Sequence, residues 1–276
     1  MSEEIKSVTR FLKESPPGEY EDVVAALKGF VENTEIIDEG IKATKEDWLI
    51  HNCSTIEIDD HKAILCEEAR RGKNKFIDPV TNKVFTYDFE NQTIVTPEPQ
   101  PAAKGEEPQP VEEETLESSS LREAIQPLAL AFAKSTVHNG TCGTYDSKNG
   151  VKIVVRASTI NKANFRTGII LMHFTCAEGN LKGSIELKGH FYEKGNCIGT
   201  QVSEFEDTYQ GDDDGAKAED IVKKLSKFFI KWNNALTQGF ELLNSEGLNK
   251  LRRRLPINAQ KINWQQELRG LGAMQK

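Results

Sequence analysis

The chain has 276 residues, of which 37% are hydrophobic and 28% charged, and a formal net charge of -8 at pH 7. Its mean hydropathy is -0.53, and no apolar run approaches the roughly 20 residues needed to span a bilayer, which argues against a membrane-inserted protein. The acidic start, Met1-Ser2-Glu3-Glu4, is unlike a signal peptide. We therefore expect a cytoplasmic protein with one large domain or two small ones.

A helical bundle is predicted for residues 1–52. Apolar residues recur at helical spacing in segments 5–12, 19–31 and 34–51, and Pro16-Pro17-Gly18 must end the first helix. Because the connections are short, the helices should be antiparallel neighbours in a small stalk.

The pattern changes at residue 53, and residues 53–96 are predicted to form a small β unit. Segments 55–59 and 62–66 alternate like a hairpin with its turn at Asp60-His61. Two further strands are expected near residues 76–79 and 84–89, separated by the turn residues Thr81-Asn82.

Residues 97–118 differ sharply in composition from the rest of the chain, with five of the ten prolines, seven glutamates and one lysine. Such a segment buries too little apolar surface to offset its ordering entropy, so we expect a disordered acidic loop. A regulatory role and an inert insertion both remain open for it.

Residues 119–247 are predicted to form the main α+β domain. A helix over residues 121–137, capped by serines and interrupted or kinked at Pro127, precedes five strands near residues 142–145, 151–157, 168–176, 181–192 and 197–205. Turn residues separate these strands, so they should form an antiparallel meander. A helix of nearly 30 residues follows, with a wide apolar stripe, and should cover the sheet. The unpaired sheet edge implies a partner subunit that completes the sheet.

No pattern in the chain indicates catalysis, a cofactor or a metal. The five cysteines are widely spaced and never form Cys-x-x-Cys, which indicates free and mostly buried thiols. The five histidines lack His-x-x-x-His spacing, and no phosphate-binding loop or calcium loop is present. We therefore expect no enzyme activity and no cofactor.

The carboxyl-terminal segment, residues 248–276, is basic and amphipathic in an otherwise acidic chain. It carries seven Lys and Arg residues against one acid, Glu267, and Pro256 divides it into two parts. A docking tail for an acidic partner is one interpretation. A final helix on its own domain, a membrane-surface helix and a solvated terminus are the alternatives. Nucleic-acid binding is disfavoured, since no nucleic-acid motif accompanies the arginines.

Three local strings, in the order just described, resemble the F-actin capping protein alpha subunit family. Residues 251–256, Leu-Arg-Arg-Arg-Leu-Pro, are similar to the Leu-Arg-Arg-x-Leu-Pro of that family, and residues 189–197, Gly-His-Phe-Tyr-Glu-Lys-Gly-Asn-Cys, resemble its Val-His-Tyr-Tyr-Glu-Asp-Gly-Asn-Val. The third string pairs residues 16–20, Pro-Pro-Gly-Glu-Tyr, with residues 76–79, Phe-Ile-Asp-Pro.

The resemblance implies a heterodimer with a capping protein beta subunit, sharing a ten-stranded antiparallel sheet, and a function in capping the barbed ends of actin filaments independently of calcium. It implies a cytoplasmic, cytoskeletal protein without stable membrane insertion. An alternative is an alpha-type structural subunit that acts mainly within a larger, dynactin-like assembly. The actin-binding residues that the resemblance implies are Lys250, Arg252, Arg253, Arg254, Lys261, Ile262, Trp264, Leu268 and Leu271.

The tail departs from the family pattern at two positions. Asn249 stands where the family usually has a basic residue, and Ala259 stands where it usually has an arginine. Lys250 and Arg254 are expected to compensate in part, so the affinity for actin should differ from that of relatives.

Overall fold

The computed structural model describes residues 3–95, 117–193 and 196–242. The chain divides into two compact units, Met1–Ser226 and Lys227–Lys276. The predicted acidic loop lies almost entirely outside the described residues, as does the whole tail from residue 248, and the predicted domain boundaries remain predictions. Among the described residues, no helix is long and apolar enough to cross a membrane.

The three amino-terminal helices form as predicted, as α1 (Glu3–Lys13), α2 (Tyr20–Phe30) and α3 (Thr34–His51). Helix α1 packs closely on α3 because Gly40 has no side chain: a Cβ there would lie 2.7 Å from Val8 Cγ1. Tyr20 Oη is 2.8 Å from Thr44 Oγ1, and Trp48 Nε1 donates to the Ser15 carbonyl at 3.0 Å. These polar contacts lock the helices into one arrangement.

The first hairpin pairs β1 (Thr55–Ile58) with β2 (His61–Ile64), and its turn lies one residue earlier than predicted. Ile58 pairs with His61, so Asp59 and Asp60 form the two-residue turn. Asp59 adopts φ 49°, the left-handed conformation that tight hairpin turns require and that Asp tolerates. The prediction of Asp60-His61 as the turn was therefore wrong.

The rest of the β unit is a four-stranded antiparallel sheet of β3 (Arg70–Gly72), β4 (Lys75–Ile77), β5 (Val84–Asp88) and β6 (Thr93–Val95). The sequence predicted β4 and β5 but missed the outer pair. β3 has the sequence Arg-Arg-Gly and carries no apolar residue, and β6 is a three-residue strand, so neither shows the alternation that predicts a strand.

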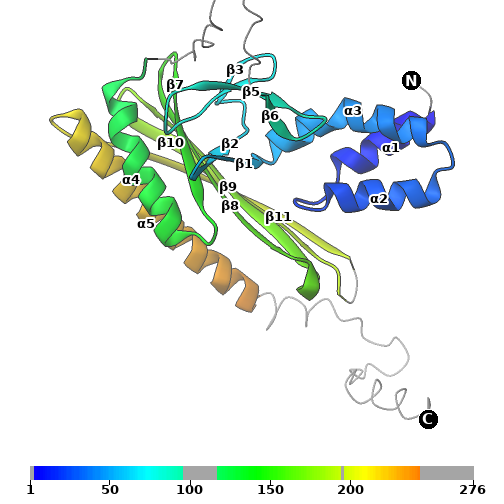
Figure 1. Ribbon diagram of the computed structural model, residues 1–276. Helices are drawn as coiled ribbons and strands as arrows, with labels where there is room; N and C mark the ends of the chain where they lie inside the picture. Colours follow the sequence, from blue (N-terminus) through cyan, green and yellow to red (C-terminus); the bar gives the residue numbers. More distant parts are fainter. Residues whose placement is uncertain (1–2, 96–116, 194–195, 243–276) are drawn as a thin grey trace, which may run out of the picture. The chain divides into compact units, whose positions relative to one another are not determined.

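The main sheet is the predicted five-stranded antiparallel meander, with order β11-β10-β9-β8-β7 (Figure 1). Its strands are β7 (Thr141–Ser147), β8 (Gly150–Asn161), β9 (Arg166–Ala177), β10 (Asn180–Phe191) and β11 (Cys197–Thr208), and all except β10 are longer than predicted. A short 3-10 helix, η1 (Lys162–Asn164), turns the chain from β8 into β9.

Both faces of the sheet are covered over β8 and β9. Val154, Ile169 and Leu171 share a core with the stalk helices and the small β unit. On the other face, Gln126 of α4 (Ser120–Thr136) receives hydrogen bonds from the backbone and hydroxyl of Thr144. Because β8 is buried on both faces, successive residues along it are apolar. A strand buried on one face only would alternate between apolar and polar residues.

Helix α4 is capped by Ser119, whose side chain accepts from the backbone of Arg122, and it continues through Pro127. The helix is therefore not interrupted at Pro127, and the alternative expectation, a kink there, stays a prediction. The long helix α5 (Asp214–Leu242) has 29 residues, close to the predicted length. Its first part is tied to the sheet, because Lys224 Nζ donates to the Thr208 carbonyl. The α+β fold class is thus confirmed for the described chain.

Candidate functional site

The site predicted from the sequence lies outside the described residues. All nine predicted actin-binding residues fall between positions 250 and 271, whereas the residues that the structure describes end at Leu242. The structure therefore shows no geometry for them. What it describes are the surfaces of the body to which this tail is joined.

One such surface is the free edge of the main sheet. All twelve residues of β11 pair with β10, and no described strand pairs with its other side. Ile198 and Val202 lie on this strand with 62% and 57% of their surface exposed. Soluble proteins usually shorten, charge or cover such an edge, because its free backbone groups pair readily with another strand. This edge is therefore a candidate interface.

A second candidate surface is a groove along the stalk helices. The groove has a volume of about 1060 Å³ and is lined mainly by side chains of α1 and α2, most of them apolar. Phe30 and Phe11 border it with 86% and 60% of their surface exposed. Phe30 sits at the end of α2, where helical spacing predicted an inward-facing residue. Its exposure marks the groove as incompletely covered.

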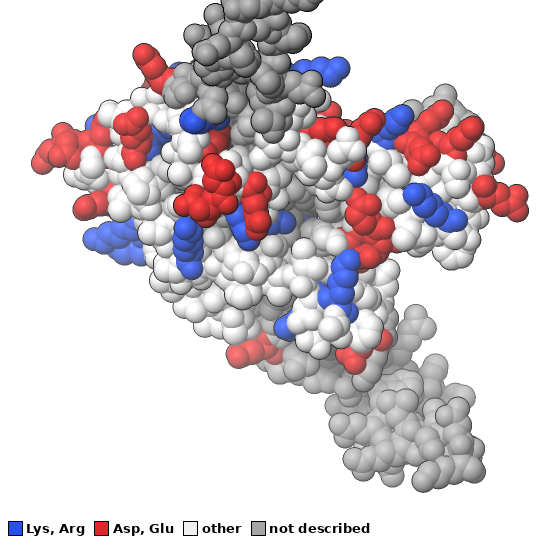
Figure 2. Space-filling model, viewed as in Figure 1, with Lys and Arg blue, Asp and Glu red and all other residues white. Residues whose placement is uncertain are grey.

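Charge does not single out one patch on the viewed face of the described chain. Figure 2 shows acidic and basic side chains both over the amino-terminal helices and around the sheet. The concentrated positive charge of the protein is a property of its sequence after residue 248.

The stalk is joined to the sheet by a buried polar cluster. Glu19 Oε1 lies 2.8 Å from His190 Nδ1 and accepts from Thr167 Oγ1 at 2.5 Å. His190 Nε2 in turn lies 2.8 Å from Asn196 Oδ1, and its ring stacks on Tyr192 at 4.9 Å between centroids. This geometry gives His190 a structural role, in which it holds the stalk on the sheet.

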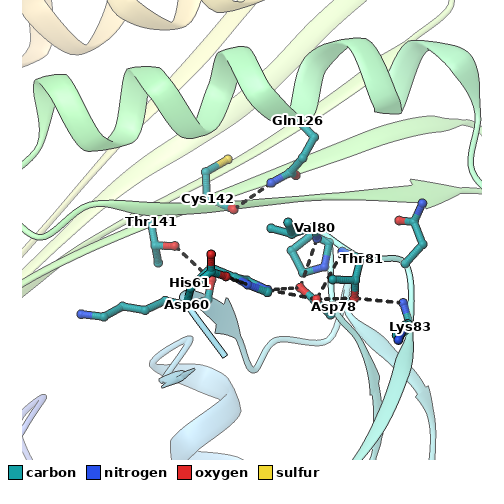
Figure 3. Close-up of polar contacts among 12 residues, drawn as sticks. Asp60, His61, Asp78, Val80, Thr81, Lys83, Gln126, Thr141 and Cys142 are labelled. Carbon is teal, nitrogen blue, oxygen red and sulfur yellow. Dashed lines mark hydrogen bonds and ion pairs between the residues drawn. The ribbon is translucent and has the colours of Figure 1, made fainter. Parts of the chain in front are cut away.

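A second histidine cluster is drawn in Figure 3, where His61 faces the carboxylate of Asp78. His61 Nε2 lies 2.9 Å from Asp78 Oδ1, while the carboxylate also accepts from the backbones of Val80 and Thr81. Burial lowers the pKa of His61, but its contacts with Asp78 and Asp60 raise it by more, so the net shift is upward. Because the Asp78 oxygens are engaged in holding a turn, the cluster fits a structural role.

Arg122 completes the connection between the small β unit and α4. Its guanidinium donates to the Thr144 carbonyl at 2.9 Å, to the Pro79 carbonyl at 2.5 Å and to the Asn82 side chain. The sequence does not predict this role for Arg122, because a single arginine on a helix carries no signal of burial. Among the described residues, no group of three or more acidic, His or Cys side chains is arranged to hold a metal ion.

These features define a class: an α+β chain whose long antiparallel meander has an open edge and whose helical stalk presents an apolar groove. The model of the F-actin capping protein alpha subunit family matches residues 8–273. The chain therefore belongs to the F-actin capping protein alpha subunit family.

Relatives and a solved structure agree with this assignment along the chain. The F-actin-capping protein subunit alpha of Dictyostelium discoideum is 26% identical, covering 95% of this chain and 93% of the relative. That of Schizosaccharomyces pombe is 27% identical, with 95% and 96% covered. The homodimeric actin capping protein alpha subunit from Plasmodium berghei has a similar fold, with a TM-score of 0.65, 15% identity, and 94% and 99% of the two chains covered.

Proposed function

We propose that this chain caps the barbed ends of actin filaments, as the alpha subunit of a heterodimer with a capping protein beta subunit. The observation that carries the proposal is the family match over residues 8–273. Relatives matched over nearly their whole length carry the name of F-actin-capping protein subunit alpha. Capping would block both addition and loss of actin subunits, without calcium.

The open edge at β11 supports a partner that adds strands to the sheet. A second five-stranded meander aligned on this edge would produce the ten-stranded sheet expected from the resemblance. Exposed Ile198 and Val202 would then lie near the new pairing, and the free backbone groups of the edge would be satisfied. The apolar groove bordered by Phe11 and Phe30 offers a second place for the same partner to bury surface.

The tail is proposed to provide the actin contact in two parts. Positive charge on Lys250, Arg252, Arg253 and Arg254 would steer the dimer to acidic filament ends and raise the association rate. The mainly apolar part beyond Pro256 would bury surface and slow dissociation. Its proposed contact residues are Lys261, Ile262, Trp264, Leu268 and Leu271.

The deciding experiment is co-expression with the candidate beta subunit of the same organism, followed by actin elongation from preformed seeds. We expect a stable pair that stops barbed-end growth at substoichiometric amounts and leaves pointed-end growth unchanged. A pair that forms but leaves barbed-end growth unchanged would contradict capping.

A homodimer is the second candidate assembly, because the structurally similar Plasmodium berghei chain is described as homodimeric. Light scattering of the chain expressed alone distinguishes the two cases. A stable dimer of this chain that caps filaments without any beta subunit would replace the heterodimer in the proposal.

A further inference from the structure

Cys53 occupies a backbone position that usually requires glycine. It follows Asn52, the C-cap residue of α3, and adopts φ 46°. Its backbone N–H donates to the Ile50 carbonyl and that of Ser54 to the Leu49 carbonyl, both at 2.9 Å. This is the Schellman ending of a helix, in which a left-handed residue other than Gly or Asn is disfavoured. A strained residue of this kind calls for a functional explanation.

The Cys53 thiol faces a histidine that is backed by an acid. Cys53 Sγ lies 3.8 Å from His173 Nε2, and His173 Nδ1 lies 3.7 Å from Glu68 Oε1. Lys152 Nζ also approaches Glu68, at 3.8 Å. The thiol of Cys53, the imidazole of His173 and the carboxylate of Glu68 thus lie in sequence. In this arrangement a proton can be shared between the sulfur and the imidazole.

The charges around this row favour a protonated imidazole. Burial lowers the pKa of His173, but Cys53 and the Glu68 carboxylate raise it to about 10 overall. The contact with His173 lowers the pKa of Glu68 to about 2. Arg156 adds a second cation near Cys53: its buried guanidinium donates to the Asn52 carbonyl at 3.2 Å. A thiol beside two cationic groups is the setting of reactive cysteines.

A second thiol is close to the first. Residues 54 and 65 are joined by a hydrogen bond from the Leu65 N–H to the Ser54 carbonyl at 2.8 Å, which extends the β1–β2 register by one pair. Cys53 precedes Ser54 and Cys66 follows Leu65, so each cysteine adjoins this hydrogen-bonded pair. Both side chains are buried, and Cys53 acts on the ionisation of Cys66, whose pKa burial raises well above its usual value. Burial therefore favours the protonated form of the Cys66 thiol.

We propose that Cys53, with His173 and Glu68 behind it, is a peroxide-oxidised thiol for which Cys66 is the resolving partner, giving a Cys53–Cys66 disulfide. The side chain of His173 is 39% exposed whereas Cys53 is 2% exposed. A small hydroperoxide would reach the buried thiol past the partly exposed imidazole.

The reaction balances in two steps. The Cys53 thiolate attacks the terminal oxygen of a hydroperoxide, the O–O bond breaks, and the departing alkoxide or hydroxide takes the proton of the His173 imidazolium. Sulfur is oxidised to sulfenic acid while the peroxide is reduced to an alcohol or water. The Cys66 sulfur then attacks the Cys53 sulfur, the S–O bond breaks, and the hydroxide leaves as water with the thiol proton of Cys66.

The other cysteines lack this combination and serve as internal comparisons. Burial raises the pKa of the Cys142 thiol, and it raises that of Cys176 to about 12. Cys197 is exposed on β11. If exposure alone controlled oxidation, Cys197 would react first.

The experiment treats the full-length chain, in its purified assembly, with hydrogen peroxide and then unfolds it in urea and blocks the remaining thiols with N-ethylmaleimide. Non-reducing peptide mapping should show a Cys53–Cys66 cross-link that forms before Cys197 is oxidised. In C66S, trapping with dimedone should label Cys53. Oxidation confined to Cys197, or a map in which Cys53 stays reduced, would overturn the proposal.

Two further variants test the mechanism. His173→Gln should slow the oxidation of Cys53 on the order of 100-fold, the lower end of what a positioned proton donor contributes. Cys53→Gly removes the sulfur while suiting the left-handed backbone, so it should fold and abolish the cross-link. If His173→Gln folds cooperatively and its Cys53 is oxidised at an unchanged rate, His173 takes no part in the reaction. The peptide map of the unsubstituted protein tests the cross-link without any variant.

Discussion

Glu19 and His190 lie 171 positions apart in the chain, yet Glu19 Oε1 and His190 Nδ1 are 2.8 Å apart, with about 90% of each side chain buried. The contact joins the start of α2 to strand β10, and thereby fixes the stalk on the sheet. Because Thr167 also donates to Glu19, one carboxylate satisfies polar groups from two strands.

Glu19→Ala should therefore destabilise the fold substantially. The substitution leaves the Thr167 hydroxyl and His190 without their acceptor in a buried setting, which costs about 1–3 kcal/mol for each group. The free energy of unfolding, measured by urea denaturation, checks this. Glu14→Ala is the matched control: Glu14 forms an exposed pair with Arg10 four residues away, worth about 0.3–0.5 kcal/mol. Equal losses in the two variants would contradict the assigned role of Glu19.

The stalk groove predicts a different behaviour for Phe30. Since 86% of its surface is exposed, Phe30→Ala should change the stability of the isolated chain by less than about 0.5 kcal/mol. If the beta subunit covers the groove, the variant should weaken the dimer by roughly 1.5–3 kcal/mol, or about 10- to 150-fold in Kd. Analytical ultracentrifugation measures this.

Lys28→Ala is the control for Phe30, because Lys28 is exposed on the same helix but does not line the groove. The dimer should tolerate this change. A Phe30→Ala dimer as tight as that of Lys28→Ala would show that the partner does not use the groove.

The sequence predicts elements well where one physical signal dominates, and poorly where a conformation depends on distant partners. Helix α3 was predicted with both ends, since Asn33 caps its start. The five-stranded meander followed from turn residues at regular spacing. The hairpin turn was displaced because Asp59 and Asp60 are both suited to turns, and only the register decides between them.

Buried polar residues were the main omission. Arg122 and Glu19 are of residue types that usually lie on the surface, and their burial depends on hydrogen-bond partners more than 20 positions away in the chain. The Cys53–His173 contact spans 120 positions, so no local pattern could reveal it. For the proposed actin site the opposite holds: only the sequence pattern indicates its basic and apolar residues, because they lie outside the described residues.

The basic part of the tail should control the rate of association with actin. Replacing Arg252, Arg253 and Arg254 with Ala should lower the association rate for barbed ends by roughly ten-fold or more at low salt, and should flatten its dependence on ionic strength. Seeded elongation at several salt concentrations measures both quantities. Unchanged capping with unchanged salt dependence would contradict electrostatic steering.

The apolar part of the tail should instead control dissociation. Trp264→Ala should raise the dissociation rate by roughly 10- to 150-fold, because full burial of a large apolar side chain is worth about 1.5–3 kcal/mol, and should leave the association rate nearly unchanged. Dilution-induced uncapping measures the dissociation rate. Gln265→Ala is the neighbouring control. If Trp264→Ala changed only the association rate, the division of the tail at Pro256 would be wrong.

The His61–Asp78 contact predicts a pH dependence of stability with a defined sign. The folded state holds the pKa of His61 above its ordinary 6.5, chiefly through Asp78 against the opposing effect of burial. Folding thus favours the protonated imidazole. The stabilisation that this contact adds to the unfolding free energy is fully present below pH 6.5 and is lost as the pH rises through the folded-state pKa of His61. His61→Gln should remove this part of the pH dependence of the unfolding free energy. Asp60→Asn should change it little, because the Asp60 side chain is 99% exposed and water screens its charge. If Asp60→Asn flattened the pH dependence of the unfolding free energy more than His61→Gln, the assignment of the effect to the His61–Asp78 contact would be wrong.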